Sequence, residues 1–256
     1  MGDYEQLKRD IHKKLGIDLT AYKEQQMRRR INQWVERHQL KTYNQLLATL
    51  DTDLEHKQKF TDYLTINTSS FFRDTKVFDV IEKKVLPEIS RGKRPRIWSA
   101  GASIGAEVYS IAMLMNEAGY KPALLLATDL DDSALAKAKE GVYLSNHVAG
   151  TDPKYLGKYF TQNSNGQWVI DESIKKQVVF RKHDLLRSAY ERDFDLILCR
   201  NVFIYFTSET QQRLIRNFVQ SLKPAGFFIV GSAEQIMDPA SFGLERFSYC
   251  IYRKIS

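Results

Sequence analysis

The sequence predicts an α/β protein in which a small helical unit precedes a larger domain built on a parallel sheet. Residues 1–75 contain no proline and no evident strand, and their apolar residues have helical spacing. From about residue 76, short β-branched apolar runs alternate with amphipathic stretches, the pattern of a parallel sheet covered on both faces. The length of 256 residues suits one small domain and one larger domain.

The first 75 residues are predicted to contain four helices. Apolar side chains such as Tyr22, Met27, Ile31 and Trp34 recur every three or four positions. The expected helices cover residues 3–15, 20–38, 41–50 and 53–64. We therefore expect residues 1–75 to form an N-terminal all-α domain.

Residues 76–256 are predicted to form the larger domain. Its expected strands cover residues 96–100, 123–129, 178–184, 195–201, 226–231 and 249–254. Its expected helices cover residues 76–90, 105–118, 132–140 and 208–222. Residues 145–177 interrupt this alternation with Pro153, Gly157 and Gly166, so we expect an insertion there, with a short strand at 167–170.

Composition excludes several classes of protein. The chain is 43% hydrophobic and 27% charged, which is typical of a globular protein, and its formal charge of 38 − 31 = +7 leaves an acidic partner open. Two cysteines, Cys199 and Cys250, imply no disulfide framework and favour a reducing cytosol. No apolar run approaches the roughly 18 residues of a membrane span, so we expect a cytoplasmic protein. The histidines lack ligand spacing, so no metal is expected.

The loop after the first strand reads Gly101-Ala102-Ser103-Ile104-Gly105 and precedes a helix. Glycines at such a turn let a ligand approach the backbone, although a tight turn without a ligand has the same residues. The loop also matches the G-x-S-x-G elbow of serine hydrolases. A helical region alone precedes this strand, and no histidine follows His183, which disfavours a hydrolase. Ser103 replaces the middle glycine of a dinucleotide loop, so a nucleoside cofactor without phosphates, such as S-adenosylmethionine, fits better.

Polar side chains end several successive strands. Asp129 ends the second strand, where a carboxylate can accept both ribose hydroxyls, and Asp184 ends the third, where it can accept from an adenine amino group. Arg200 and Asn201 end the fourth strand. Parallel strands end at the same edge of a sheet, so these residues indicate a ligand site there, with simple caps of the strand ends as the alternative.

Five segments of the sequence resemble the chemotaxis receptor methyltransferases of the CheR family. They read N-T-S-S-F-F-R-D (67–74), W-S-A-G-A-S-I-G-A-E-V-Y-S (98–110), A-T-D-L-D (127–131), C-R-N-V-F-I-Y-F (199–206) and the terminal strand. The resemblance implies a Rossmann-like class I methyltransferase domain, with an inserted β-subdomain at about 145–177. It also implies methyl transfer from S-adenosylmethionine to glutamate side chains of methyl-accepting chemotaxis receptors, which gives glutamate methyl esters.

The resemblance also implies the residues of the site. Cofactor contacts would come from the glycine loop and the strand ends, namely Asn67, Ser69, Arg73, Gly101, Glu107, Asp129, Asp184, Leu185, Arg200 and Asn201. Arg73 and Tyr205 would lie nearest the transferred methyl group. We interpret Arg73 as orienting the acceptor carboxylate and Tyr205 as shaping the pocket. A surface ion pair and a core aromatic are the alternative interpretations of these two residues.

Two positions of the glycine loop depart from the family pattern. Ala106 replaces the first glutamate of the usual pair, and Val108 replaces a common proline. These changes concern cofactor affinity more than the type of reaction. They also leave an alternative, a module of the same fold that binds the cofactor or its product without turnover.

The N-terminal helical region is basic. Residues 8–41 contain ten Lys or Arg against four Asp or Glu, an excess of 10 − 4 = +6, and Arg28, Arg29 and Arg30 are adjacent. A basic helix would steer the protein toward an acidic receptor bundle, and a solvated face is the alternative. Nucleic acid is disfavoured because no nucleic-acid module is recognised. We expect a monomer.

Overall fold

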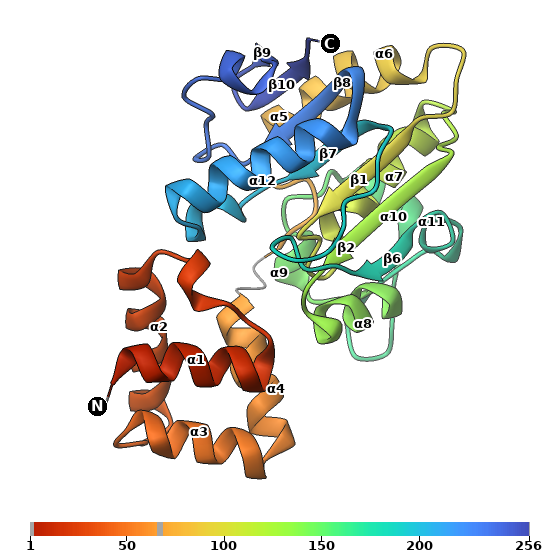
Figure 1. The fold of residues 1–256 in the computed structure, drawn as a ribbon. Helices are drawn as coiled ribbons and strands as arrows, with labels where there is room; N and C mark the ends of the chain where they lie inside the picture. Colours follow the sequence, from red (N-terminus) through yellow and green to blue (C-terminus); the bar gives the residue numbers. More distant parts are fainter. Residues whose placement is uncertain (1–2, 66–68, 256) are drawn as a thin grey trace. The chain divides into compact units, whose positions relative to one another are not determined.

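The structure is a computed structural model that describes residues 3–65 and 69–255. The chain is divided into two compact units, whose elements are shown in Figure 1. The first unit comprises Met1–Asn67 and Tyr205–Arg213, and the second comprises Thr68–Ile204 and Leu214–Ser256.

The first unit is helical up to Thr65. Its core consists of apolar side chains at helical spacing, among them Leu7, Ile11, Met27 and Ile31. Its elements are α1 (Tyr4–Leu15), η1 (Leu19–Ala21), α2 (Glu24–Arg37), α3 (Tyr43–Thr52) and α4 (Leu54–Thr65). The four predicted helices are confirmed. The second of them begins later than predicted because residues 19–21 form a separate 3-10 turn capped by Asp18.

A segment from far along the chain completes the first unit. Tyr22 and Phe206 form an antiparallel bridge, and their rings lie 4.8 Å apart. The backbone N–H of Lys23 donates to the carbonyl of Tyr205 at 2.8 Å, and that of Thr207 donates to the carbonyl of Ala21 at 3.0 Å. Three of the N-terminal residues are therefore tied to residues 205–207, a pairing that helical periodicity does not predict.

The second unit is built on a seven-stranded sheet. Its strand order is β6-β2-β1-β7-β8-β10-β9. The strands are β1 (Arg96–Ala100), β2 (Leu124–Asp129), β6 (Val179–Lys182), β7 (Phe194–Cys199), β8 (Leu222–Val230), β9 (Leu244–Ser248) and β10 (Ile251–Lys254). The strand order reverses at β1, which pairs with β2 on one side and β7 on the other. In such sheets the crevice at this point, beyond the carboxyl ends of the strands, is where ligands bind.

All six predicted strands are confirmed, with two differences. β10 pairs with β8 in the antiparallel direction, so the sheet is mixed and not wholly parallel. β9 was not predicted. It lies at the edge of the sheet and its middle residues, Glu245 and Arg246, are exposed, so it lacks the apolar run of a central strand.

Helices cover both faces of this sheet. Trp98 and Ser99 are adjacent in β1, and neighbouring side chains of a strand point to opposite faces. The Trp98 ring packs against Phe218 of α12 (Ser208–Ser221), whereas the Ser99 hydroxyl donates to Glu107 of α7 (Ala106–Glu117). α8 (Asp132–Glu140) packs on β2 and β6. Burial on both sides explains why β1 and β7 are mostly apolar and lack a regular polar alternation.

The helix predicted at 76–90 contains a wider turn. It consists of α5 (Thr75–Val80), the π-helical turn η2 (Ile81–Val85) and α6 (Leu86–Ser90). Pro87 stands in the first turn of α6. Because proline has no N–H and its ring crowds the preceding turn, the regular α-helical hydrogen bonding cannot continue through this position.

A second, antiparallel sheet includes two strands from the stretch predicted as an insertion, 145–177, and a third strand, β3 (Val142–Tyr143), that begins before it. Its strand order is β3-β5-β4, from β3, β4 (Phe160–Gln162) and β5 (Trp168–Ile170), and β5 includes most of the short strand predicted at 167–170. The short helices α9 (Ser145–Val148), α10 (Pro153–Tyr159) and α11 (Glu172–Lys175) accompany it. The remaining 3-10 turns are η3 (Phe203–Tyr205) and η4 (Ala240–Phe242).

Candidate functional site

The glycine loop connects the carboxyl end of β1 to α7. The N–H groups of Gly101 and Ala102 both donate to the carbonyl of Thr128, at 2.8 and 2.9 Å, which holds the loop against the end of β2. Gly101 has a φ of +73°, and a Cβ there would lie 2.6 Å from a methyl carbon of Val202. A side chain at position 101 would therefore displace the segment that follows β7.

Asp129 is fixed beside this loop. One carboxylate oxygen accepts from the N–H of Ser103 at 2.7 Å, and the other accepts from the N–H of Asp131 at 3.0 Å. Burial raises the pKa of Asp129, and these backbone donors act in the opposite direction. The Ser103 hydroxyl is buried and has no hydrogen-bond partner among the described residues. The Ser103 hydroxyl and the Asp129 carboxylate therefore lie together at the edge of the sheet, where they could bind a polar ligand.

Arg200 joins three parts of the second unit. Its side chain is 2% exposed. One terminal nitrogen, Nη1, lies 3.2 Å from Glu107, and the other, Nη2, donates to Asp74 at 2.7 Å and to the carbonyl of Arg73 at 2.8 Å. Glu107 in turn accepts from the Ser99 hydroxyl at 2.7 Å. The guanidinium of Arg200 thus brings the predicted cofactor residue Glu107 and the backbone of Arg73 together.

Asn201 lies at the end of β7 in a left-handed backbone conformation, with a φ of +62°. Its N–H donates to a carboxylate oxygen of Glu234 at 2.7 Å. Glu234 was not predicted from the sequence. The same signal that identified Asp129 and Asp184 would have found it, because Glu234 is also an acid just beyond a buried strand.

Asp184 and Leu185 follow β6. One oxygen of Asp184 accepts from the N–H of Leu186 at 2.8 Å, and the backbone N–H of Asp184 donates to the Ser188 hydroxyl at 3.1 Å. The Leu185 carbonyl accepts from the Tyr190 hydroxyl at 2.9 Å. Asp184 therefore stabilises the turn in which it lies, and its role toward an adenine stays a prediction.

The motif around Arg73 is anchored in the second unit. The Phe71 ring contacts Tyr143 of β3 and Phe160 of β4 edge-on, at 4.8 and 5.0 Å between ring centres. The N–H of Phe72 donates to the Ser110 hydroxyl of α7 at 3.0 Å. Ser69 and Arg73 are half-buried on either side of this anchor. Asn67 lies outside the described residues.

Tyr205, the second candidate for the methyl-transfer pocket, belongs to the first compact unit. Its carbonyl accepts from Lys23, at the start of α2. Arg73 belongs to the second unit. The roles of both residues stay predictions.

The three adjacent arginines of α2 differ in their surroundings. Arg30 donates to the carbonyl of Tyr63 and lies 4.4 Å over the Tyr63 ring, so its guanidinium is used within the unit. Arg28 lies 5.3 Å over the ring of Tyr4. Arg29 is exposed and makes no hydrogen bond or ion pair with a described residue.

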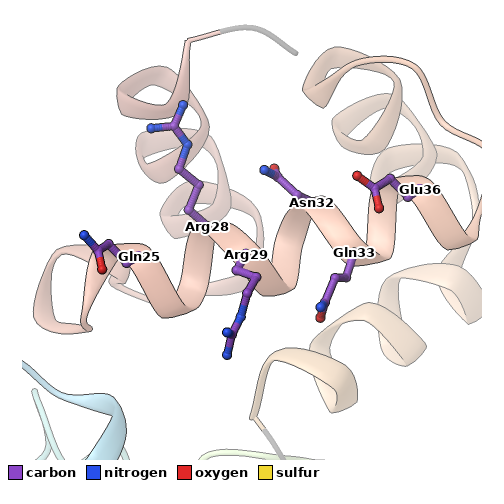
Figure 2. Close-up of a pocket in the computed structure, with 6 residues that line it drawn as sticks. All are labelled: Gln25, Arg28, Arg29, Asn32, Gln33 and Glu36. Atoms are coloured by element: carbon purple, nitrogen blue, oxygen red, sulfur yellow. The ribbon is translucent and has the colours of Figure 1, made fainter.

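Arg28 and Arg29 line a shallow pocket along α2, shown in Figure 2. Its volume is about 460 Å³, and every lining side chain is polar: Gln25, Arg28, Arg29, Asn32, Gln33 and Glu36. These positions repeat every three or four residues and form one polar face of the helix. Figure 2 shows Arg28 and Arg29 leaving α2 in different directions.

Within residues 3–65 and 69–255, no group of three or more His, Cys, Asp or Glu side chains could hold a metal ion. None of the helices described is both long enough and apolar enough to cross a membrane. Cys199 and Cys250 are both buried, and burial raises the pKa of each thiol.

Comparison with known proteins identifies two matching family models. The CheR methyltransferase all-alpha domain matches residues 2–65, and the CheR methyltransferase SAM binding domain matches residues 67–249. A chemotaxis protein methyltransferase of Listeria innocua is 38% identical, over 98% of this chain and 97% of its own length. Chemotaxis protein methyltransferase 1 of Pseudomonas aeruginosa is 33% identical, over 91% of this chain and 90% of its own. A solved S-adenosylmethionine-dependent methyltransferase from Mesorhizobium loti is more distant, with 21% identity and a TM-score of 0.35 over 58% of this chain and 50% of that one.

Proposed function

Because this chain belongs to the CheR methyltransferase family, we propose that it methylates glutamate side chains of methyl-accepting chemotaxis receptors, forming glutamate methyl esters. The chain is an S-adenosylmethionine-dependent methyltransferase. The observation that carries the choice of substrate is the match over nearly the full length to relatives named chemotaxis protein methyltransferases.

The residues at the carboxyl edge of the sheet suit S-adenosylmethionine. Gly101 lets the glycine loop pass close to Val202, Asp129 offers carboxylate oxygens for hydroxyl groups, and the buried Ser103 hydroxyl has no partner among the described residues. We assign Asp129 to the ribose and Glu107, Asp184, Leu185, Arg200 and Asn201 to the rest of the cofactor. When bound, the cofactor supplies a methyl group activated by a sulfonium charge.

The acceptor needs little activation. A glutamate carboxylate has a pKa of about 4.3 and is ionised at neutral pH, so no general base is required. Opposite charges cancel as the ester forms, so a pocket that excludes water favours the reaction. Arg73 orients the carboxylate, and its backbone position is supported by the hydrogen bond from Arg200. Tyr205 shapes the pocket.

The N-terminal helices, up to Thr65, dock the enzyme on the receptor. The second compact unit, which includes Arg73, carries the methyl transfer. Receptor methylation regions are acidic helical bundles, which suit the basic residues Arg28, Arg29 and Arg30. Arg29 is the best placed for a partner, because Arg30 is engaged by Tyr63. The enzyme acts as a cytoplasmic monomer and uses no metal.

The test is a transfer assay with labelled S-adenosylmethionine and receptor-rich membranes. We expect base-labile label on the receptor, as for a carboxyl methyl ester. Binding of the cofactor without transfer would contradict the proposed reaction.

Arg73→Ala tests the assigned role within that assay. We expect turnover to fall about a hundred-fold, the size typical of a misplaced reactant, and to fall by more than the binding of S-adenosylhomocysteine weakens, since Arg73 is also a predicted cofactor contact. Lys76→Ala is the matched control, because Lys76 is an exposed cation three residues away. Normal turnover in Arg73→Ala would show that the role is assigned wrongly.

A further inference from the structure

A carboxylate outside the predicted site joins the ends of β7 and β8. One oxygen of Glu234, Oε2, accepts from the N–H groups of Asn201 and Gly231, both at 2.7 Å. The other oxygen, Oε1, accepts from the N–H of Ile204 at 3.0 Å. Two of these donors lie in the segment that follows β7, and the third lies directly after β8.

The surrounding backbone is shaped to admit this carboxylate. A Cβ on Gly231 would lie 2.5 Å from Oε2 of Glu234 and 2.9 Å from the backbone nitrogen of Asn201, so any other residue would displace one of them. Asn201 is held at a φ of +62°, a conformation that costs free energy and persists where the surroundings determine it. The hydrogen bond to Glu234 is one of those determinants.

The contact requires both oxygens of a carboxylate. Glu234 forms no salt bridge with a described residue. Burial raises its pKa, and the backbone N–H groups that donate to it act in the opposite direction, in favour of the charged form. An amide has one oxygen, and its NH₂ group would face at least one of the three donors. An apolar residue at this place would leave all three N–H groups without this acceptor.

We propose that Glu234 is a positioning residue of the methyltransferase site: it fixes the Asn201–Ile204 segment and so presents Asn201 to the cofactor. This rests on the proposed function in one respect, the assignment of Asn201 as a cofactor contact. The carboxylate does not itself need to touch the cofactor. Its effect is exerted through the backbone that it holds.

The test compares Glu234→Gln with Glu245→Gln, a matched change at an exposed acid of β9. Calorimetry with S-adenosylhomocysteine measures affinity, and amide hydrogen exchange measures the order of residues 201–204. We expect Glu234→Gln to lose about ten-fold in affinity, the size of one charge-assisted hydrogen bond, and to exchange faster at Asn201 and Ile204. Exchange at Gly101 and Ala102, which bond to Thr128, should stay slow.

Two outcomes overturn the inference. The first is a folded Glu234→Gln variant with unchanged affinity, and the second is weaker binding with unchanged exchange at residues 201–204. Glu234→Asp provides a second variant, since it keeps the charge but shortens the reach, and it should weaken binding also. Failure of the unmodified protein to bind S-adenosylhomocysteine would instead contradict the proposed function, so the two failures are distinguishable.

Discussion

The guanidinium of Arg200 is shared by groups that are distant in the sequence. It contacts the Glu107 and Asp74 carboxylates and the Arg73 carbonyl. Arg200 is buried and Glu107 is partly buried, so their charges carry a desolvation cost, whereas Asp74 is exposed. The planar fork of arginine offers two separated donors, which lysine lacks. Its value is therefore geometric: it sets where Arg73 stands with respect to the glycine loop.

His183 gives a residue-scale prediction about pH. Burial against Trp98 and Tyr190 lowers the pKa of His183 below its ordinary value of 6.5. Between its folded pKa and 6.5, His183 is therefore neutral in the folded protein but protonated in the unfolded chain. The free energy of unfolding consequently falls as the pH is lowered from 6.5 toward the folded pKa. His56 and His147 are shifted in the same direction.

We expect His183→Gln to have a flatter dependence of stability on pH below 6.5 than the unmodified protein. Chemical denaturation at a series of pH values measures it. Comparing the two proteins cancels the contributions of His56, His147 and the carboxyl groups. An identical slope in the variant would show that His183 does not titrate differently on unfolding.

At the scale of elements, α2 carries the docking hypothesis. Arg29 is exposed and is not engaged within the described part of the chain, so reversing its charge should change docking without changing the fold. We expect Arg29→Glu to reduce the rate of receptor methylation about five-fold at low salt, since a surface ion pair is worth up to about 1 kcal/mol. The effect should shrink as salt screens it.

Lys41→Glu supplies the control for that experiment, because Lys41 is an exposed cation outside α2 and the change in net charge is the same. Methylation rates at several salt concentrations measure both variants. Equal losses in the two would mean that overall charge matters and that α2 is not the docking face.

The spacing of apolar residues along the sequence predicted most of the helices and strands, but it missed β9 and the π-helical turn η2. The mostly apolar segments of β1 and β7 and the apolar spacing of α2 are local signals, and these three elements were predicted. β9 was not predicted because an exposed strand at the edge of a sheet has no run of apolar residues. The π-helical turn before Pro87 was not predicted, because the residues around it favour a helix and the sequence therefore suggested one regular helix.

The candidate site was predictable where a motif or a strand end marked it. Asp129 and the glycine loop lie together as their positions at the strand ends imply. Arg200 was identified, but its contacts with Asp74 and Glu107 were not, because they join residues far apart in the sequence. Glu234 was missed although it follows a buried strand, as Asp129 and Asp184 do. Its contacts with Asn201 and Ile204 could not be predicted, because they join residues far apart in the sequence.

At the scale of the whole molecule, the first unit depends on residues from late in the chain. Phe206 is buried against Tyr22. We expect Phe206→Ala to destabilise this unit by about 3 to 5 kcal/mol, the usual cost of removing a buried phenylalanine ring. Amide hydrogen exchange in α2 should accelerate. Phe242→Ala, a half-buried ring of the second unit, is the control and should leave α2 unchanged.

The same arrangement determines when the helical unit can be finished during synthesis. Domains generally fold as they leave the ribosome, the N-terminal one first. Here the unit that is translated first also contains Tyr205–Arg213. Its closing segment emerges only after most of the catalytic sheet has been made. The nascent chain must therefore carry an incomplete helical unit through most of its translation.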